Sequence, residues 1–142
     1  MLVSAPLGVI LGVQPWNFPY YQLARVAGPN LMAGNVVMVK HASNVPQAAA
    51  AFEMLLLEAG APAGAYTNLY ATKDQINLLI DDDRVRGVAL TGSEGAGAVV
   101  AARAGKNLKK STMPPACISG DRRPARTSWA LDHRAKWRAN SP

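Results

Sequence analysis

Short apolar runs of strand length alternate with longer helical segments along most of this chain, and this alternation constrains the fold more than any other feature. The strand-length runs cover residues 8–13, 35–40, 67–70 and 85–90. The segments with a helical period cover residues 20–32, 47–59, 73–79 and about 93–104. Strands separated by helices pair in parallel, because each helix carries the chain back to the start of the next strand. We therefore predict the α/β class, with a Rossmann-like parallel sheet and crossover helices.

Proline and glycine mark the ends of these predicted elements. Pro15 stops the first strand, and Gly34 and Gly60 follow the first two helices, where a residue with a left-handed backbone commonly ends a helix. Pro46 suits the first turn of the second helix, and Ser43 or Asn44 is the expected N-cap.

The sequence changes character after Met113. Residues 114–142 contain four prolines and six Lys or Arg against two Asp or Glu, and neither period is sustained. Such a segment cannot bury enough apolar surface to offset the entropy lost on ordering. We predict that residues 1–113 form the folded part and that residues 114–142 are a disordered tail.

The placement of charge narrows the classes of partner. The chain has a formal charge of +6, but residues 1–113 hold nine Lys or Arg against seven Asp or Glu. Most of the excess lies in the tail, so we expect no nucleic-acid partner. Cys117 is the single cysteine, which excludes an internal disulfide and a cysteine-based metal site and suits the reducing cytoplasm. Because no run of about 18 apolar residues occurs, we expect no membrane partner.

The segment Pro15-Trp16-Asn17-Phe18-Pro19 directly follows a predicted buried strand. Open α/β sheets bind ligands at the carboxyl ends of their strands, which makes this loop a candidate site. Two prolines would fix the loop and hold the Asn17 amide as a preorganised donor for a developing oxyanion. A proline-bracketed turn with a packed tryptophan explains the same residues, and the sequence leaves both interpretations open.

Three further features of the sequence are candidates for binding. Lys40 ends the second strand and Ser43 follows three residues later, so a cation and a hydroxyl could meet a ribose or phosphate; a solvated lysine is the alternative. The segment Thr91-Gly92-Ser93 opens a helix, whose N-terminal amides favour a phosphate, although such glycines often serve packing only. Arg25 is a lone cation in an apolar helical segment, where simple snorkelling to solvent is the alternative to a binding role.

Taken in order and with their spacing, several motifs resemble the aldehyde dehydrogenase superfamily, and within it the succinate-semialdehyde dehydrogenases. They are Pro15-Trp16-Asn17-Phe18-Pro19, Gly34-Asn35-Val36-Val37, Lys40, Glu58-Ala59-Gly60 with Pro62-Ala63-Gly64, and Leu90-Thr91-Gly92-Ser93. The match covers about residues 6–113. The family combines a cofactor domain, a catalytic domain and an oligomerisation arm, and this stretch resembles most of the first. The resemblance thus implies a partial NAD(P)-binding domain, a small aldehyde substrate and a parent enzyme that is a homo-oligomer.

The resemblance also implies roles for single residues. Asn17 matches the asparagine of the oxyanion hole, and Pro15 and Trp16 match residues that line the cofactor. Lys40 matches the lysine at the adenosine ribose, while Gly92 and Ser93 match the turn near the pyrophosphate.

Two further positions concern specificity. Ser43 stands where members that prefer NAD often carry a glutamate, so NADP as well as NAD is an expected cofactor. Arg25 matches the arginine that holds the substrate carboxylate in succinate-semialdehyde dehydrogenases.

The family pattern stops abruptly after Met113. Members continue into an E-L-G-G motif with the general-base glutamate and later a catalytic cysteine, whereas Pro114-Pro115-Ala116-Cys117 stands here. This abrupt change suggests a truncated chain with a frameshifted tail, in which Cys117 is incidental. The first hypothesis is a piece of an NAD(P)-dependent enzyme that oxidises succinate semialdehyde or a similar short aldehyde to the acid. The alternative is a catalytically inactive nucleotide-binding or interaction module.

Overall fold

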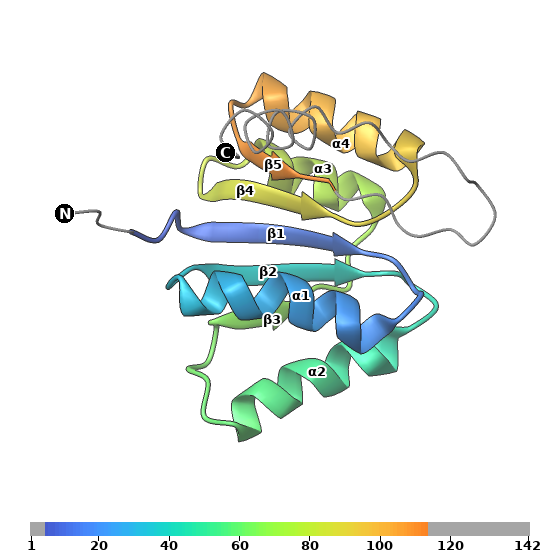
Figure 1. The fold of residues 1–142 in the computed structure, drawn as a ribbon. Helices are drawn as coiled ribbons and strands as arrows, with labels where there is room; N and C mark the ends of the chain where they lie inside the picture. Colours follow the sequence, from blue (N-terminus) through green and yellow to red (C-terminus); the bar gives the residue numbers. More distant parts are fainter. Residues whose placement is uncertain (1–4, 114–142) are drawn as a thin grey trace, which may run out of the picture.

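The computed structural model describes residues 5–113, which form strands and helices in strict alternation around one parallel sheet (Figure 1). The strands are β1 (Val9–Gln14), β2 (Val36–His41), β3 (Tyr66–Asn68), β4 (Val85–Leu90) and β5 (Lys110–Thr112). The helices are α1 (Pro19–Met32), α2 (Pro46–Glu58), α3 (Lys73–Asp81) and α4 (Glu94–Lys106). Every pair of neighbouring strands is parallel, and the strand order is β3-β2-β1-β4-β5. The predicted α/β class with a parallel sheet is confirmed.

Strand β1 lies at the centre of the sheet. Its residues from Val9 to Gln14 run beside Val36 to His41 of β2, and β4 pairs along its other edge with a register shift after Val9. A parallel strand covered on both faces is apolar almost throughout, and the sequence VILGVQ of β1 has this character. The central position puts Gln14, and the loop that follows it, in the middle of the carboxyl edge of the sheet.

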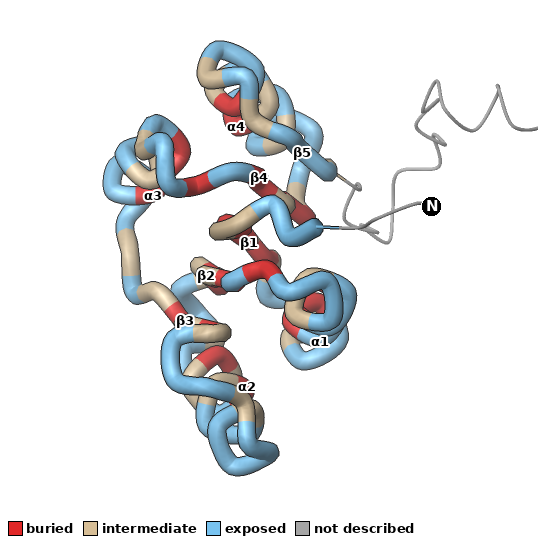
Figure 2. Tube along the Cα trace, turned by 90° about the vertical axis from the view of Figure 1, so that its left-hand side faces the viewer, coloured by how far each residue is buried: buried red, intermediate tan, exposed pale blue. Residues whose placement is uncertain are grey.

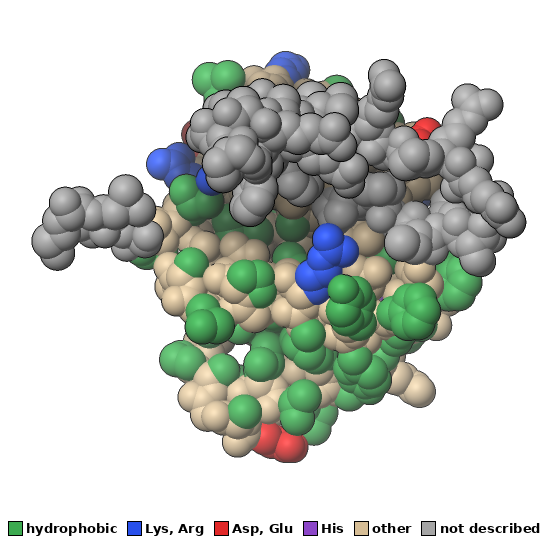
Figure 3. All heavy atoms as spheres, in the orientation of Figure 1, with side chains coloured by type: hydrophobic (Ala, Val, Ile, Leu, Met, Phe, Trp, Pro, Cys, Tyr) green, Lys and Arg blue, Asp and Glu red, His purple; other side chains and the backbone are tan. Residues whose placement is uncertain are grey.

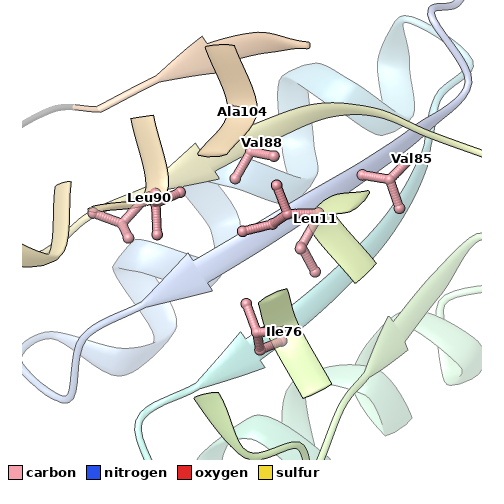
Figure 4. Packing of buried hydrophobic residues seen from close by; sticks show 8 residues of the cluster. Leu11, Ile76, Val85, Val88, Leu90 and Ala104 are labelled. Carbon is pink, nitrogen blue, oxygen red and sulfur yellow. The ribbon is translucent and has the colours of Figure 1, made fainter. Parts of the chain in front are cut away.

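Two helices cover each face of the sheet, as the two perpendicular views show (Figures 1 and 2). One face packs against α1 and α2 through a core of Leu23, Val26, Ala27, Val37, Val39, Phe52 and Tyr66. The other face packs against α3 and α4, where Leu11 lies among side chains from β4, α3 and α4 (Figure 4). Leu11 and Leu23 are completely buried, so each face has its own dry core.

Close approach of α1 to the sheet depends on Gly12. A Cβ atom at this position would lie 3.1 Å from Cγ2 of Val39 and 3.5 Å from Cγ2 of Val26. The absent side chain therefore lets α1 lie directly over β1. Gly34 follows the end of α1 with φ of +80°, the left-handed conformation that ends helices.

Some predicted boundaries were wrong. The chain turns between Ala42 and Val45, where the Val45 amide donates to the Ala42 carbonyl at 3.2 Å. This turn puts Val45 at the N-cap of α2, with no side-chain cap, so neither Ser43 nor Asn44 has that role. Strand β3 begins at Tyr66 and ends at Asn68, because the chain leaves the sheet before the exposed Tyr70.

The predicted tail, residues 114–142, lies outside the described residues, as does Cys117. The predicted boundary at Met113 coincides with the last described residue, so the tail prediction stays untested. Within residues 5–113, no helix is both long enough and apolar enough to cross a membrane.

Candidate functional site

The strand order creates a crevice at the carboxyl edge of the sheet. Strands β1 and β4 are neighbours, yet β1 leads into α1 on one face while β4 leads into α4 on the other. Such a switch point is where open α/β sheets bind ligands, because the two outgoing loops diverge and leave space between them. The loops after β1 and β4 are the Pro15–Phe18 and Thr91–Ser93 segments. The structure therefore brings two of the sequence-predicted motifs to the same crevice.

The loop after β1 holds an unusual backbone conformation. Phe18, directly before Pro19, has φ of 52° and ψ of 56°. Left-handed backbone costs an L-residue about 1–2 kcal/mol, and a following proline disfavours helical backbone further. Strain of this kind persists where surrounding structure enforces it, commonly at functional sites.

Asn17 is half-buried within this loop. Its Oδ1 atom is buried without a hydrogen-bond partner among the described residues. The adjacent Trp16 is 64% exposed, so it is not the packed tryptophan of the structural alternative. The indole of Trp16 is thus exposed beside Asn17 at the carboxyl edge.

A pocket of about 260 Å³ lies where β2 and β3 end beside the start of α2. Lys40 and Ser43 both line it, as the sequence predicted, together with Asn68, Tyr70 and Thr72. Its lining contains no Asp or Glu. Both amide atoms of the buried Asn68 lack a partner among residues 5–113. Sequence reasoning missed Asn68, Tyr70 and Thr72, because they form no local motif and come together only when β3 lies beside β2.

A second pocket, also of about 260 Å³, contains Arg25. It lies between α1 and the ends of β1, β4 and β5, and Gln14, Gln22 and Thr91 contribute polar atoms. No carboxylate of residues 5–113 lines it, so Arg25 has no paired anion from the described part of the chain in this pocket. The arginine is exposed, in agreement with snorkelling, and it lies in a pocket with both apolar and polar side chains.

The turn after β4 serves α4 directly. Ser93 is the N-cap of α4, and its hydroxyl accepts from the Ala96 amide at 3.4 Å. A Cβ atom on Gly92 would lie 3.3 Å from Cδ2 of Leu90, so the close packing there favours glycine. The Ser93 hydroxyl keeps its hydrogen for an external acceptor, and the first amides of α4 point toward the carboxyl edge.

His41 is a buried polar residue to which the sequence assigned no chemistry. It is 5% exposed, and burial lowers its pKa below the ordinary histidine value, opposed in part by the backbone carbonyls of Gln14 and Pro19. The imidazole is therefore neutral at physiological pH.

The surface above α1 is mainly apolar. In the space-filling view, hydrophobic side chains gather on the face that carries α1, with few charged groups among the visible described atoms (Figure 3). Exposed aromatic side chains at the start of α1 belong to Phe18, Tyr20 and Tyr21. Within the described part of the chain, no three His, Cys, Asp or Glu side chains come together as a metal site.

The strand order, the switch point and the pockets at the carboxyl edge define the class of doubly wound α/β domains. The family model described as the aldehyde dehydrogenase family matches residues 1–114. The chain belongs to the aldehyde dehydrogenase family.

Curated and solved relatives agree with this assignment. A succinate-semialdehyde dehydrogenase [NADP(+)] from Deinococcus radiodurans is 52% identical over 112 residues, which cover 79% of this chain and 24% of the relative. The succinic semialdehyde dehydrogenase of Streptococcus pyogenes, solved with NADP+, is 57% identical with a TM-score of 0.75, covering 77% of this chain and 24% of that one. An aldehyde dehydrogenase C mutant of Pseudomonas syringae, solved with NAD+ and octanal, is 29% identical with a TM-score of 0.74, covering 78% and 23%. The chain thus spans about a quarter of the length of these relatives.

Proposed function

We propose that the chain provides the cofactor-binding part of an NAD(P)-dependent aldehyde dehydrogenase that oxidises succinate semialdehyde or a similar short carboxylated aldehyde to the acid. The observation that carries the proposal is the meeting of the Pro15–Phe18 loop, the Lys40 pocket and the α4 N-terminus at one sheet edge. The names of the relatives support the substrate class. On this view residues 1–113 form the binding unit, and residues 114–142 are a separate segment.

The pocket containing Lys40 and Ser43 fits the adenosine end of a dinucleotide. Lys40 supplies a positive charge, Ser43 supplies a hydroxyl, and no carboxylate in the lining would repel a 2′-phosphate. The polar atoms of Asn68 add donors and acceptors that the described protein leaves unpaired. The residues present therefore fit NADP at least as well as NAD.

The pyrophosphate would lie over the start of α4. The free amides of a helix N-terminus, together with the helix dipole, favour an anion there. Ser93 caps this helix and can still donate its hydroxyl hydrogen to a phosphate oxygen. Pro15 and Trp16 would flank the cofactor from the other side of the switch point.

Asn17 and Arg25 would act on the aldehyde. In this chemistry a thiolate attacks the carbonyl carbon and negative charge develops on the carbonyl oxygen, and a nicotinamide cofactor, when bound, would supply the hydride acceptor. The Asn17 amide would donate to that oxygen, and the strained loop would keep the donor in place. Arg25 would hold the distant carboxylate, which explains a cation without a paired anion from residues 5–113 in the second pocket.

A second candidate is a nucleotide-binding module without catalysis. The observation that favours it is that residues 5–113 contain no cysteine, the nucleophile of this chemistry, since the single cysteine is Cys117. Both candidates share the cofactor site, and they differ in whether aldehyde is consumed.

One pair of measurements on the full 142-residue chain tests the proposal. Calorimetry should show NADP binding that weakens about tenfold in Lys40→Met, the loss of one charge-assisted contact. Lys106→Met, at an exposed lysine that ends α4 on the opposite edge of the sheet, is the matched control and should bind as the original chain does. Formation of NADPH from NADP and succinate semialdehyde, above a blank without protein, would favour the enzyme over the module. Absence of any nucleotide binding would contradict both candidates.

A further inference from the structure

The Pro15–Phe18 loop is held mainly at its two ends. Pro15 has no amide hydrogen, and the backbone bonds outside helices and strands within residues 5–113 include none from Pro15, Trp16 or Asn17. At the far end, the Phe18 carbonyl accepts from the Gln22 amide at 3.0 Å. A strained loop with so few internal bonds needs support from a neighbouring element to keep Asn17 in one place.

His41 lies against both ends of this loop. It ends β2 directly beside Gln14 in the parallel register, and Gln14 immediately precedes Pro15. The carbonyls of Gln14 and Pro19, which bracket the loop, both lie close enough to the imidazole to raise its pKa against the larger effect of burial. One buried side chain therefore faces the start of the loop and the start of α1 at once.

The tautomer of this imidazole follows from its other nitrogen. The Ala42 amide donates to His41 Nδ1 at 2.9 Å, so Nδ1 carries no proton and a neutral ring carries its proton on Nε2. Nε2 is buried and makes no hydrogen bond of normal geometry among the described residues. The backbone groups that act on this imidazole are those of Gln14 and Pro19, at the two ends of the loop.

We propose that His41 is a positioning residue: its neutral imidazole links the end of β2 to both ends of the Pro15–Phe18 loop and thereby holds Asn17. This inference rests on the proposed role of Asn17 as oxyanion donor. Protonation of His41 would put a hydrogen on Nδ1, facing the Ala42 amide, and a charge inside the protein beside Lys40. The loop should therefore loosen as His41 gains a proton.

The carboxylates among the described residues at this end of the sheet, Asp74 in the first turn of α3 and Glu94 in the first turn of α4, belong to helices on the face opposite α1 and α2. Strand β1, the loop and the first turns of α1 and α2 contain no acidic residue. The ionisable groups on the elements packed around His41 are Lys40, Tyr20, Tyr21, Arg25, Tyr66, Tyr70, Glu53 and Glu58, and Lys73 and Asp74 directly follow Thr72 of the pocket that His41 lines. The two glutamates lie in the second half of α2, away from the end of β2.

The test is nuclear magnetic resonance of the full chain without nucleotide. The chain has two histidines, and His133→Gln assigns the signals of His41. The ring should show the Nε2-protonated tautomer at neutral pH and should titrate below the ordinary histidine pKa. Amide signals of Trp16, Asn17 and Phe18 should shift and broaden with the same midpoint. Loop signals that do not change through this titration, or a neutral ring protonated on Nδ1, would overturn the inference. Both measurements use the chain with His41 in place.

Two substitutions separate the loop contact from simple packing. His41→Gln can place an amide N–H near the position of Nε2, whereas His41→Asn can replace only the acceptor at Nδ1. Hydrogen exchange at Asn17 should be several-fold faster in His41→Asn than in His41→Gln, because only the glutamine keeps an N–H that can face the loop. Equal exchange in the two variants would count against the inference. These measurements are made without nucleotide. If the chain bound no NADP but His41 still held the loop, only the proposed function would be refuted.

Discussion

Replacing Ser43 by glutamate should reverse the cofactor preference of the site. Ser43 is exposed and lines the same acid-free pocket as Lys40, so a new carboxylate there would face a bound 2′-phosphate. At about 5 Å and an effective dielectric constant of about 40, two unit charges repel by about 1.7 kcal/mol. A phosphate carries a charge of about −1.5 to −2, which would raise this repulsion up to about twofold, and salt would reduce it, so that the net repulsion is about 1.5–3 kcal/mol.

That energy corresponds to a roughly 10- to 150-fold loss of NADP affinity. NAD lacks the 2′-phosphate, and its ribose hydroxyls can donate to the new carboxylate, so its affinity should hold or rise. Ser43→Gln is the matched control, because it adds similar volume without charge. Calorimetry of both cofactors at two salt concentrations measures the effect. Equal NADP affinities for the glutamate and glutamine variants would refute the electrostatic argument.

The remaining predictions concern the second pocket and the core. Arg25→Met should weaken binding of succinate, a stable dicarboxylate probe, by about tenfold, because one charge-assisted contact is lost. Unchanged binding would contradict the proposal that Arg25 holds a substrate carboxylate. Tyr66→Phe should leave stability unchanged or raise it by up to about 1 kcal/mol, because the buried Tyr66 hydroxyl has no partner among residues 5–113. Phe52→Ala should cost about 3–5 kcal/mol in thermal or denaturant unfolding. Burial raises the pKa of Tyr66, so the free energy of unfolding that depends on the neutral phenol is fully present below about pH 10 and falls at higher pH. This fall should occur in the original chain but not in Tyr66→Phe.

The secondary structure was predictable because local patterns determine it here. Strands such as VILGVQ are apolar on both faces, and Gly34 ends α1 where the left-handed backbone requires it. The N-cap of α2 was not predictable by the same rules. Ser43 and Asn44 are good capping residues, but the turn from Ala42 to Val45 fixes the helix start at Pro46.

The candidate site was predictable only where its residues lie within short motifs. Lys40 and Ser43 were expected to face one edge of the sheet, and they do line one pocket. Asn68 and Gln22 gave no signal, because a buried amide on a strand or a helix resembles any other polar residue until neighbouring elements surround it. A role for His41 was not predictable from the sequence for the same reason, since its position beside the ends of the loop depends on the register between β1 and β2.

Chemical-shift mapping with NADP tests the central claim most directly. The account predicts that nucleotide added to the labelled full chain shifts amide signals at the carboxyl edge of the sheet, in residues 16–18, 40–43, 68–72 and 92–96. The loops at the opposite edge, residues 60–65, 82–84 and 107–109, serve as the internal control and should stay unchanged. Shifts confined to that opposite edge, or no shifts at saturating NADP, would contradict the assignment of this edge as a cofactor site.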